Sequence, residues 1–295
     1  MSSKSGDSIQ ITRTYLDKLV VEGRIVGAVR PSTETTLFGK TVQTPIMTAA
    51  LSHLQGGMAG LAKGAMGVGA FAQIGMGDNE ELSKALATGA NVIKIIKPYA
   101  DPEEIFSRLR FAEEHGAVAV GMDVEHAVNV EDDTDSLVAG YQMKLPTLDE
   151  LRRYIEATKL PFLIKGAYSA QDAVRAKELG CAGVIVSHHN GLLRWAVPHV
   201  LLLKEIRKAV GDDFAVIIDG GIADGFDAFK ALALGASAVS VGRPLMLPYA
   251  EKGAAGVTET LQKMTAQLRA MMLRTGSPDV QHIDPAVVHE APWLS

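Results

Sequence analysis

Eight short apolar segments, separated by amphipathic stretches of helical periodicity, constrain the fold of this 295-residue chain more than any other feature. The segments are rich in Val, Ile and Ala, as buried strands of a parallel sheet are, and the stretches between them have the pattern of crossover helices. The predicted strands are Pro45–Ala49, Gly67–Ala70, Val92–Ile96, Val118–Met122, Phe162–Lys165, Gly183–Ser187, Ala215–Asp219 and Ala238–Val241. Eight such units in a chain of this length predict an α/β fold, a closed (β/α)8 TIM barrel.

We interpret the remaining segments as additions to a single barrel domain that comprises residues 1–295. Residues 1–43 predict an N-terminal cap segment, with a helix followed by a small hairpin around TTLFGKTVQTP, and 253–276 predict a helix after the eighth unit. The longest irregular stretch, 124–146, is acidic and follows the fourth strand. Loops after barrel strands surround the active face. This stretch is therefore either a solvated surface insertion or a mobile lid over the site.

The composition limits the classes of molecule that this chain is expected to bind. The hydrophobic share of 47% and the charged share of 21% suit one large core and not a disordered chain. A net charge of −5 gives no basic face for a nucleic acid or an anionic membrane. The polar N-terminus lacks the apolar run of a signal peptide, and the single Cys181 lies in an apolar segment as a reduced core thiol. We expect a cytoplasmic protein with a small-molecule substrate.

Polar and ionisable side chains gather where the predicted strands end. The carboxyl ends of all barrel strands meet at one rim, so these side chains are expected to surround a single site. They are Ser52, Lys94, Lys97, Asp123, Glu125, His126, Lys165, Ser187, His188, His189, Asp219 and Arg243. Any one of them can be a satisfied rim residue, but their coincidence at one rim indicates a catalytic site.

The loops after the seventh and eighth strands predict a phosphate-binding site. Asp219, Gly220 and Gly221 follow the seventh strand, and Gly242 and Arg243 follow the eighth. Glycine lets the backbone approach a phosphate closely, an arginine can pair with it, and barrels bind phosphate at this place. A tight turn explains the glycine pair equally well, so the arginine gives the pattern its specificity.

The side chains of Lys165 and His189 suggest catalytic roles, and two roles are open for Lys165. Lys165 is either a Schiff-base lysine or a cation beside the electron-poor ring of a cofactor. His189 is a candidate general base, because imidazole titrates close to neutral pH. A divalent metal ion is a further possibility, although the spacing of its candidate ligands is not diagnostic. Those ligands are Asp123, Glu125, His126, His188 and His189.

Four segments, LPFLIKG, GVIVSHHNG, VIIDGGIADGFDAFKALALGA and SVGRP, resemble the FMN-dependent 2-hydroxy-acid oxidases and dehydrogenases, the family of glycolate oxidase and lactate oxidase. PIMTAALS resembles the first strand of that family and LRTGSPDVQHI its C-terminal helix, so the resemblance extends from about Thr36 to Ile283. It implies FMN as cofactor, a homotetramer, and oxidation by proton abstraction with hydride transfer to the flavin.

The resemblance also implies roles for individual residues. His189 matches the catalytic base, Glu125 the aspartate that pairs with it, and Lys165 the lysine beside the flavin N1–C2 edge. The positions implied to contact the flavin or its phosphate are Ala50, Leu51, Ser52, Lys94, Asp123, Lys165, Ser187, Asp219, Gly220, Gly221, Gly242 and Arg243.

The substrate side departs from the family pattern. Leu192 stands where the family has the arginine that holds the substrate carboxylate, and losing a bidentate arginine is not a conservative change. Ile96 replaces a site tyrosine, and Ala223 replaces a second phosphate arginine. Leu192, Arg194 and His188 are the predicted substrate-side residues, with Arg194 as a possible substitute clamp.

Ordinary lactate or glycolate oxidation is thereby in question, and other reaction types stay open. They are an FMN-dependent reductase, an isomerase resembling type 2 isopentenyl diphosphate isomerase, a metal-dependent barrel lyase and a non-catalytic flavin carrier.

Overall fold

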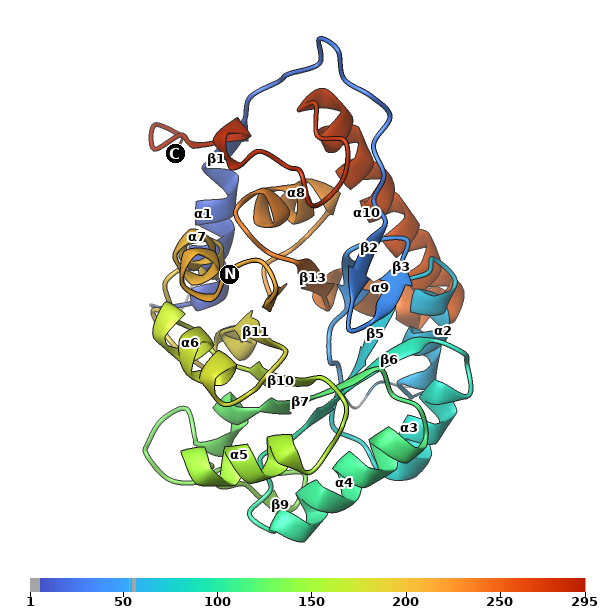
Figure 1. The fold of residues 1–295 in the computed structure, drawn as a ribbon, viewed down its shortest axis with the longest axis vertical. Helices are drawn as coiled ribbons and strands as arrows, with labels where there is room; N and C mark the ends of the chain where they lie inside the picture. Colours follow the sequence, from blue (N-terminus) through green and yellow to red (C-terminus); the bar gives the residue numbers. More distant parts are fainter. Residues whose placement is uncertain (1–5, 53, 55–56, 295) are drawn as a thin grey trace.

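The computed structural model describes residues 6–52, 54 and 57–294. Parallel strands close into a barrel in the order β10-β11-β12-β13-β4-β5-β6-β7 (Figure 1). These strands are β4 (Ile46–Thr48), β5 (Phe71–Ile74), β6 (Asn91–Ile96), β7 (Ala119–Asp123), β10 (Phe162–Lys165), β11 (Gly183–Ser187), β12 (Ala215–Asp219) and β13 (Ala238–Val241). The predicted TIM-barrel fold is confirmed.

The second predicted strand was wrong. Residues 67–70 form the turn that ends α2 (Ala59–Met66), where Ala70 N–H donates to the Ala65 carbonyl and Gly69 has φ +67°. The strand begins one residue later, at Phe71. Polar Gln73 hid this strand in the sequence, yet its side chain is fully buried inside the barrel.

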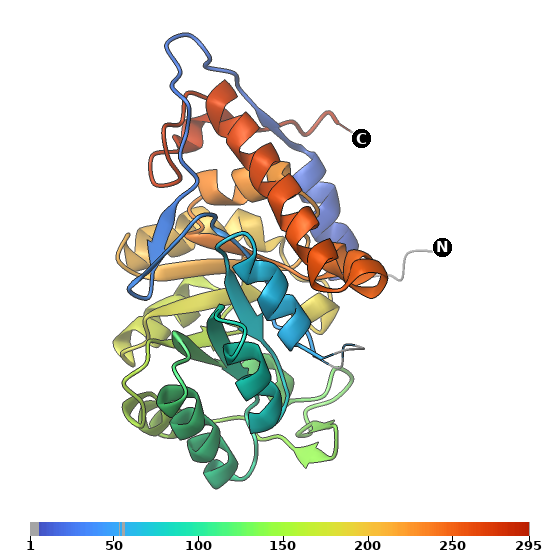
Figure 2. The same cartoon turned by 90° about the vertical axis from the view of Figure 1, so that its right-hand side faces the viewer.

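Helices cover the outside of the barrel (Figure 1). Asp101, Thr147, Ser169 and Asp224 cap four of them by accepting backbone N–H groups of the first turn, as the sequence pattern predicts. The helices after α2 are α3 (Asn79–Leu86), α4 (Pro102–Glu114), α5 (Leu148–Glu156), α6 (Ala170–Glu178), α7 (His199–Val210), α8 (Gly225–Ala233), α9 (Arg243–Lys252) and α10 (Ala254–Arg274). Figure 2 shows α10 running along the flank of the barrel beside α2, against which it packs.

Alternation along the strands divides the core in two. Successive side chains of a strand point to opposite faces, so every second residue points into the barrel. The inner layer takes apolar residues from every strand: Met47, Phe71, Ile93, Ile95, Ala119, Leu163, Ile185, Ile217 and Ala238. Their neighbours, such as Val92, Val184 and Val216, pack outward against the helices.

The hairpin of the N-terminal segment closes the barrel at its amino end. The hairpin of β2 (Thr35–Leu37) and β3 (Lys40–Val42) packs on the inner layer, with the rings of Phe38 and Phe71 6.1 Å apart. Before it lie α1 (Ser8–Asp17) and β1 (Leu19–Val21), which pairs with β14 (Val288–Glu290) near the chain's end. A site within the barrel can therefore open only at the carboxyl ends of the strands.

Residues 124–146 carry little regular structure. They contain a 3-10 turn at Val124–Ala127 and a short hairpin of β8 (Leu137–Val138) and β9 (Tyr141–Gln142). Among the described helices, none is long and apolar enough to span a membrane.

Candidate active site

A cavity of about 670 Å³ opens at the carboxyl rim of the barrel. It lies against the loops that follow β4, β12 and β13 and against one face of α1. Its lining is Ile9, Gln10, Arg13, Ala49, Ala50, Leu51, Lys165, His189, Asp219, Gly220, Gly221, Ile222, Ala223, Ser240, Gly242, Arg243, Pro244 and Met246. Nine of the proposed cofactor or catalytic residues are among these: Ala50, Leu51, Lys165, His189, Asp219, Gly220, Gly221, Gly242 and Arg243.

One end of the cavity has the features of an anion site. Gly220 and Gly221 have φ of +103° and +72°, and a Cβ on Gly221 would lie 2.7 Å from Thr12 Cγ2, so glycine is required there. Helix α9 begins at Arg243 without a side-chain cap. The amino end of α9 lines the cavity with Gly242 and Arg243, so the positive pole of the helix and the guanidinium of Arg243 together favour an anion there.

Helix α1 covers this end of the cavity, a feature that sequence reasoning missed. Arg13 donates to the Gly221 carbonyl at 3.2 Å and to Asp227, with Nη2–Oδ1 at 2.9 Å. Its remaining donors go to Asp17. Arg13 thus fixes α1 to the glycine loop, close to Ala223, where the resemblance implied an arginine. No local sequence signal points to this contact, because it joins residues more than 200 positions apart.

Below the anion site, four charged side chains point inward from the strand ends. Lys97 Nζ lies 2.8 Å from Asp123 Oδ2, and Lys165 Nζ lies 3.4 Å from the same oxygen and 3.7 Å from Asp219 Oδ2. These two lysines and two aspartates form a ring of side chains. Their two positive and two negative charges cancel without any ligand. Lys97, Asp123 and Lys165 are buried, so their charges are stable only because they are paired.

The pKa shifts follow from this pairing. Burial alone would raise the pKa of Asp123, but Lys165, the His189 hydrogen bond and Lys97 hold it well below its usual range. Burial alone would lower the pKa of Lys165, but Asp123 and Asp219 raise it above its usual value. Both groups are therefore ionised at neutral pH.

His189 stands between this ring and the cavity. Its Nδ1 lies 3.0 Å from Asp123 Oδ2 and 2.9 Å from Lys165 Nζ. Its backbone has φ +43°, and its N–H donates to Ser187 Oγ, which in turn donates to Asp219. Burial, followed by the charge of Lys165, lowers the pKa of His189, so its imidazole is neutral and can accept a proton.

Glu125 does not make the contact expected of it. The carboxylate beside His189 is Asp123, two residues earlier, whereas Glu125 Oε2 is buried with no hydrogen-bond partner among the described residues. Burial raises the pKa of Glu125 to about 7. Asp123 points inward from the last position of β7, while Glu125 lies in the 3-10 turn beyond it, where strand alternation no longer holds.

Lys94 also lies elsewhere than expected. In β6 the inward-facing residues are Ile93 and Ile95, so Lys94 and Ile96 point outward. Lys94 Nζ donates to the Gly75 carbonyl at 2.7 Å, and burial lowers its pKa to about 7. The next inward position after Ile95 is Lys97, which the resemblance did not assign.

The expected substrate-side residues do not converge on the cavity. Arg194 pairs with Glu131 at 2.7 Å, and both side chains are exposed. His188 is fully buried and faces α1, with Nε2 3.5 Å from Thr12 Oγ1. Leu192 is half-buried outside the cavity lining. Ser52, a proposed flavin contact, instead accepts the Met76 N–H at 2.9 Å.

A metal ion does not fit this arrangement well. Candidate ligand atoms of Asp123, His126 and His189 lie within 4.8 Å of one another. However, the ammonium groups of Lys97 and Lys165 already contact Asp123, and Lys165 also contacts His189 Nδ1. A divalent cation there would meet two positive charges at close range.

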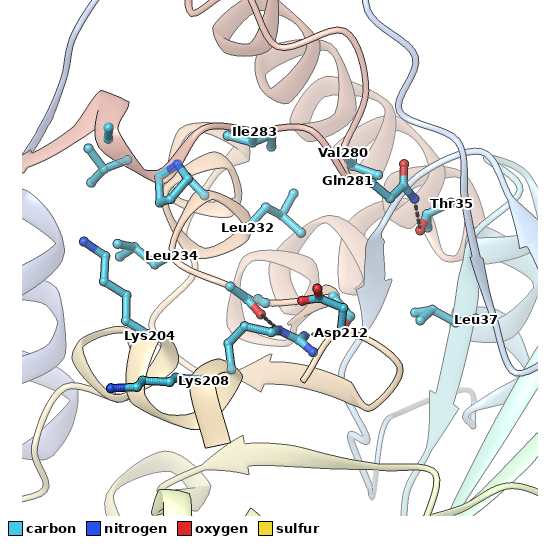
Figure 3. Close-up of a pocket in the computed structure, with 18 of the residues that line it drawn as sticks. Thr35, Leu37, Lys204, Lys208, Asp212, Leu232, Leu234, Val280, Gln281 and Ile283 are labelled. Carbon is cyan, nitrogen blue, oxygen red and sulfur yellow. Dashed lines mark hydrogen bonds between the residues drawn. The ribbon is translucent and has the colours of Figure 1, made fainter. Parts of the chain in front are cut away.

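A second, larger hollow of about 940 Å³ lies away from this rim (Figure 3). It involves α7, the segment after α8 and the C-terminal segment, near the amino ends of β12 and β13. Arg207 in its wall donates to three backbone carbonyls and to Ser237, so its charge is fully engaged. Figure 3 shows leucines at its centre and Lys204 and Lys208 to one side. The hollow lacks the converging acid, base and anion groups of the rim cavity.

The rim cavity fits a flavin mononucleotide. The anion site accommodates a phosphate, and Lys165 supplies a buried cation within the same cavity. Oε1 of buried Gln73 has no partner among the described residues, and its Nε2 donates to Ser240 at the cavity wall. This leaves one unpaired buried acceptor next to the cavity wall.

Comparisons with known proteins agree with this fit. The family model of FMN-dependent dehydrogenases matches residues 128–290. An L-lactate oxidase of Alicycliphilus denitrificans is 42% identical over 138 residues, 46% of this chain but only 38% of the relative's length. An L-lactate oxidase of Lentilactobacillus hilgardii is 26% identical over 93% of this chain and 84% of its own length.

A solved mandelate oxidase variant with the monooxide FMN adduct has a TM-score of 0.87 and 28% identity, covering 98% of this chain and 93% of its own. Fold, cavity and family model lead to one conclusion: the chain belongs to the family of FMN-dependent dehydrogenases.

Proposed function

We propose that the rim cavity binds FMN and that the chain oxidises an alcohol carbon of a small molecule, with His189 as the base. The observation that carries this proposal is His189 itself, which lines a cavity with an anion site and has a buried carboxylate, Asp123, behind its imidazole. The relatives named above are lactate and mandelate oxidases.

Each residue has a separate task in this proposal. Gly221, Gly242, Arg243 and the start of α9 hold the phosphate, and Lys165 places a positive charge beside the ring. Bound FMN supplies the acceptor for a hydride. His189 removes the hydroxyl proton at Nε2, and Asp123 stabilises the imidazolium that forms.

The phosphate contact of Arg243 gives a direct test. Arg243→Ala is expected to weaken FMN binding roughly ten- to hundredfold, since a charged hydrogen bond contributes about 1.5–3 kcal/mol. Fluorescence titration of the apoprotein with FMN measures the loss. Riboflavin, which lacks the phosphate, should bind both proteins equally, and Arg194→Ala on the surface is the matched control. Equal losses for riboflavin and FMN would place the phosphate elsewhere.

The substrate is proposed to be uncharged at the position where relatives hold a carboxylate. The inner ring is already neutral, Arg194 is engaged at the surface, and Leu192 cannot pair with an anion. A bound carboxylate would therefore be an uncompensated buried charge.

Anaerobic flavin bleaching by matched substrates tests this. Lactamide and methyl lactate are expected to bleach the flavin at least about tenfold faster than lactate, and mandelamide faster than mandelate, because a tenfold preference needs only 1.4 kcal/mol. Fast bleaching by lactate would contradict this proposal, because it would require a cation of the chain to pair with the substrate carboxylate. Bleaching by no alcohol, with turnover of a carbonyl or phosphorylated compound, would favour the reductase or isomerase alternative.

Three further proposals rest on the sequence and on the family resemblance. They are a homotetramer, a cytoplasmic location, and a lid formed by residues 124–146 of the barrel domain.

A further inference from the structure

Residues 220–223, the glycine loop after β12, line the rim cavity with all their positions. Among the described residues, none accepts a hydrogen bond from the N–H of Gly221 or of Ile222. The next N–H, that of Ala223, donates to Asp227 Oδ2 at 3.0 Å. The loop therefore carries two consecutive backbone donors without an acceptor, and such donors form an anion-binding nest when they point to the same side.

The carbonyl of Gly220 is held from α7. Nε2 of His199 lies 2.7 Å from this oxygen, and Nδ1 of the same ring accepts the Val200 N–H at 3.1 Å. Because Nδ1 is an acceptor, the ring proton is on Nε2 and is donated to Gly220. The side chain of His199 is fully buried, and this burial lowers its pKa to about 4. The imidazole is therefore neutral near pH 7 and keeps this tautomer.

The carbonyl of Gly221 is held from α1, where Arg13 Nη1 donates to it at 3.2 Å. The other guanidinium N–H groups donate to Asp17 and to both carboxylate oxygens of Asp227. Each N–H group of Arg13 thus has an acceptor within the chain, and two carboxylates offset its charge. Arg13 is therefore suited to hold the loop and not to bind a phosphate directly.

The two held carbonyls decide where the free N–H groups point. In a trans peptide the C=O and the following N–H point in opposite directions, and the described residues contain no cis peptide bond. The Gly221 N–H therefore points away from buried His199, and the Ile222 N–H points away from the Arg13 guanidinium. Gly221 and Ile222 line the cavity, whereas His199 does not.

We infer that His199 and Arg13 are positioning residues of the FMN site. They hold the two glycine carbonyls back, so that the two free N–H groups are presented to the phosphate. Gly220 and Gly221 both have a positive φ, and glycine adopts either sign of φ readily. Without the two donors the peptide between them can turn over, which would direct a carbonyl oxygen at the phosphate.

This inference rests on the proposed function and deepens its cofactor site. The charge at the anion site comes from Arg243 and the start of α9, whereas His199 and Arg13 supply only the shape of the loop that faces them. A positioning role of this kind affects the phosphate of the cofactor and not its ring. It therefore predicts a loss that is confined to ligands with a phosphate.

Comparing FMN with riboflavin isolates the phosphate contribution. His199→Leu and Arg13→Met are each expected to weaken FMN binding roughly tenfold and to leave riboflavin binding as it is. His199→Gln keeps an N–H donor and should retain most of the FMN affinity. Fluorescence titration of the apoprotein measures both dissociation constants, with exposed His282→Leu and Arg194→Met as matched controls. Equal losses for the two flavins, or no loss for either, would overturn the positioning role.

NMR of the natural protein tests the same point if a variant fails to fold. In isoleucine-labelled protein, the Ile222 N–H signal is assigned by its loss in Ile222→Val. It should move downfield when FMN replaces riboflavin, because a phosphate oxygen then accepts its hydrogen bond. Inorganic phosphate added to the riboflavin complex should move it in the same direction. FMN binding with an unmoved signal would refute this inference alone, whereas failure to bind any flavin would refute the proposed function.

Discussion

Replacing His189 with alanine is expected to slow flavin reduction by at least about 10²–10⁴-fold, the usual contribution of a general acid or base. The proposed oxidation ends with the substrate proton on this imidazole, so it fails without His189. The flavin absorbance spectrum should stay unchanged, because His189 lines the cavity outside the anion site. Rapid-mixing bleaching measures the rate.

Two controls make the His189 result interpretable. His282→Ala removes an exposed imidazole paired with Asp279 and should leave the rate as it is. Added imidazole should partly restore His189→Ala if the loss is one of proton transfer, since the alanine leaves space in the cavity. A variant that bleaches at the natural rate would remove His189 from the reaction.

Replacing Asp123 with asparagine is expected to have the largest effect on stability. The change leaves the buried ammonium groups of Lys97 and Lys165 without their shared carboxylate, and breaking a buried pair in this way typically costs about 3–5 kcal/mol. Urea unfolding followed by circular dichroism measures the loss. Asp123→Asn with Lys97→Met should lose less than the sum of the two single changes, because the double variant removes one stranded charge.

The loss of unfolding free energy caused by Asp123→Asn is expected to change with pH in a defined direction. The pKa of Asp123 is lowered in the folded state, so its stabilisation is fully present above the unfolded value of about 3.9 and is lost as the pH falls below it. The difference in unfolding free energy between the natural protein and Asp123→Asn should therefore be constant near neutral pH and shrink below about pH 4. A difference that grows on acidification would show that Asp123 is not held ionised by the lysines.

Local pattern was enough to predict much of the fold and part of the site. Seven of the eight barrel strands coincide with apolar runs seen in the sequence, because parallel strands are buried on both faces. The glycine loop at Gly220–Gly221 and the Gly242–Arg243 turn were also visible, since a positive φ and a phosphate-directed arginine leave local signals. In β5, buried Gln73 broke the apolar pattern, and the expected strand moved to a helix-ending turn.

The partners of the charged residues were decided by tertiary structure. Successive residues of β6 point to opposite faces, so Lys94 points outward whereas Lys97 points inward and contacts Asp123. Sequence similarity alone does not show which of two neighbouring positions points inward. Asp123 and not Glu125 lies against His189 because only the former still follows strand alternation.

The sequence by itself determined a TIM barrel of the FMN-dependent dehydrogenase type, with its phosphate loops and a histidine at the rim, because each of these depends on residues close together in the chain. The tertiary structure decided the Arg13 contact that brings α1 over the cavity, the neutral ring of Lys97, Asp123, Lys165 and Asp219, and the contact of His199 with the glycine loop. These contacts join residues from separate strands and loops, and their geometry exists only once the barrel has closed.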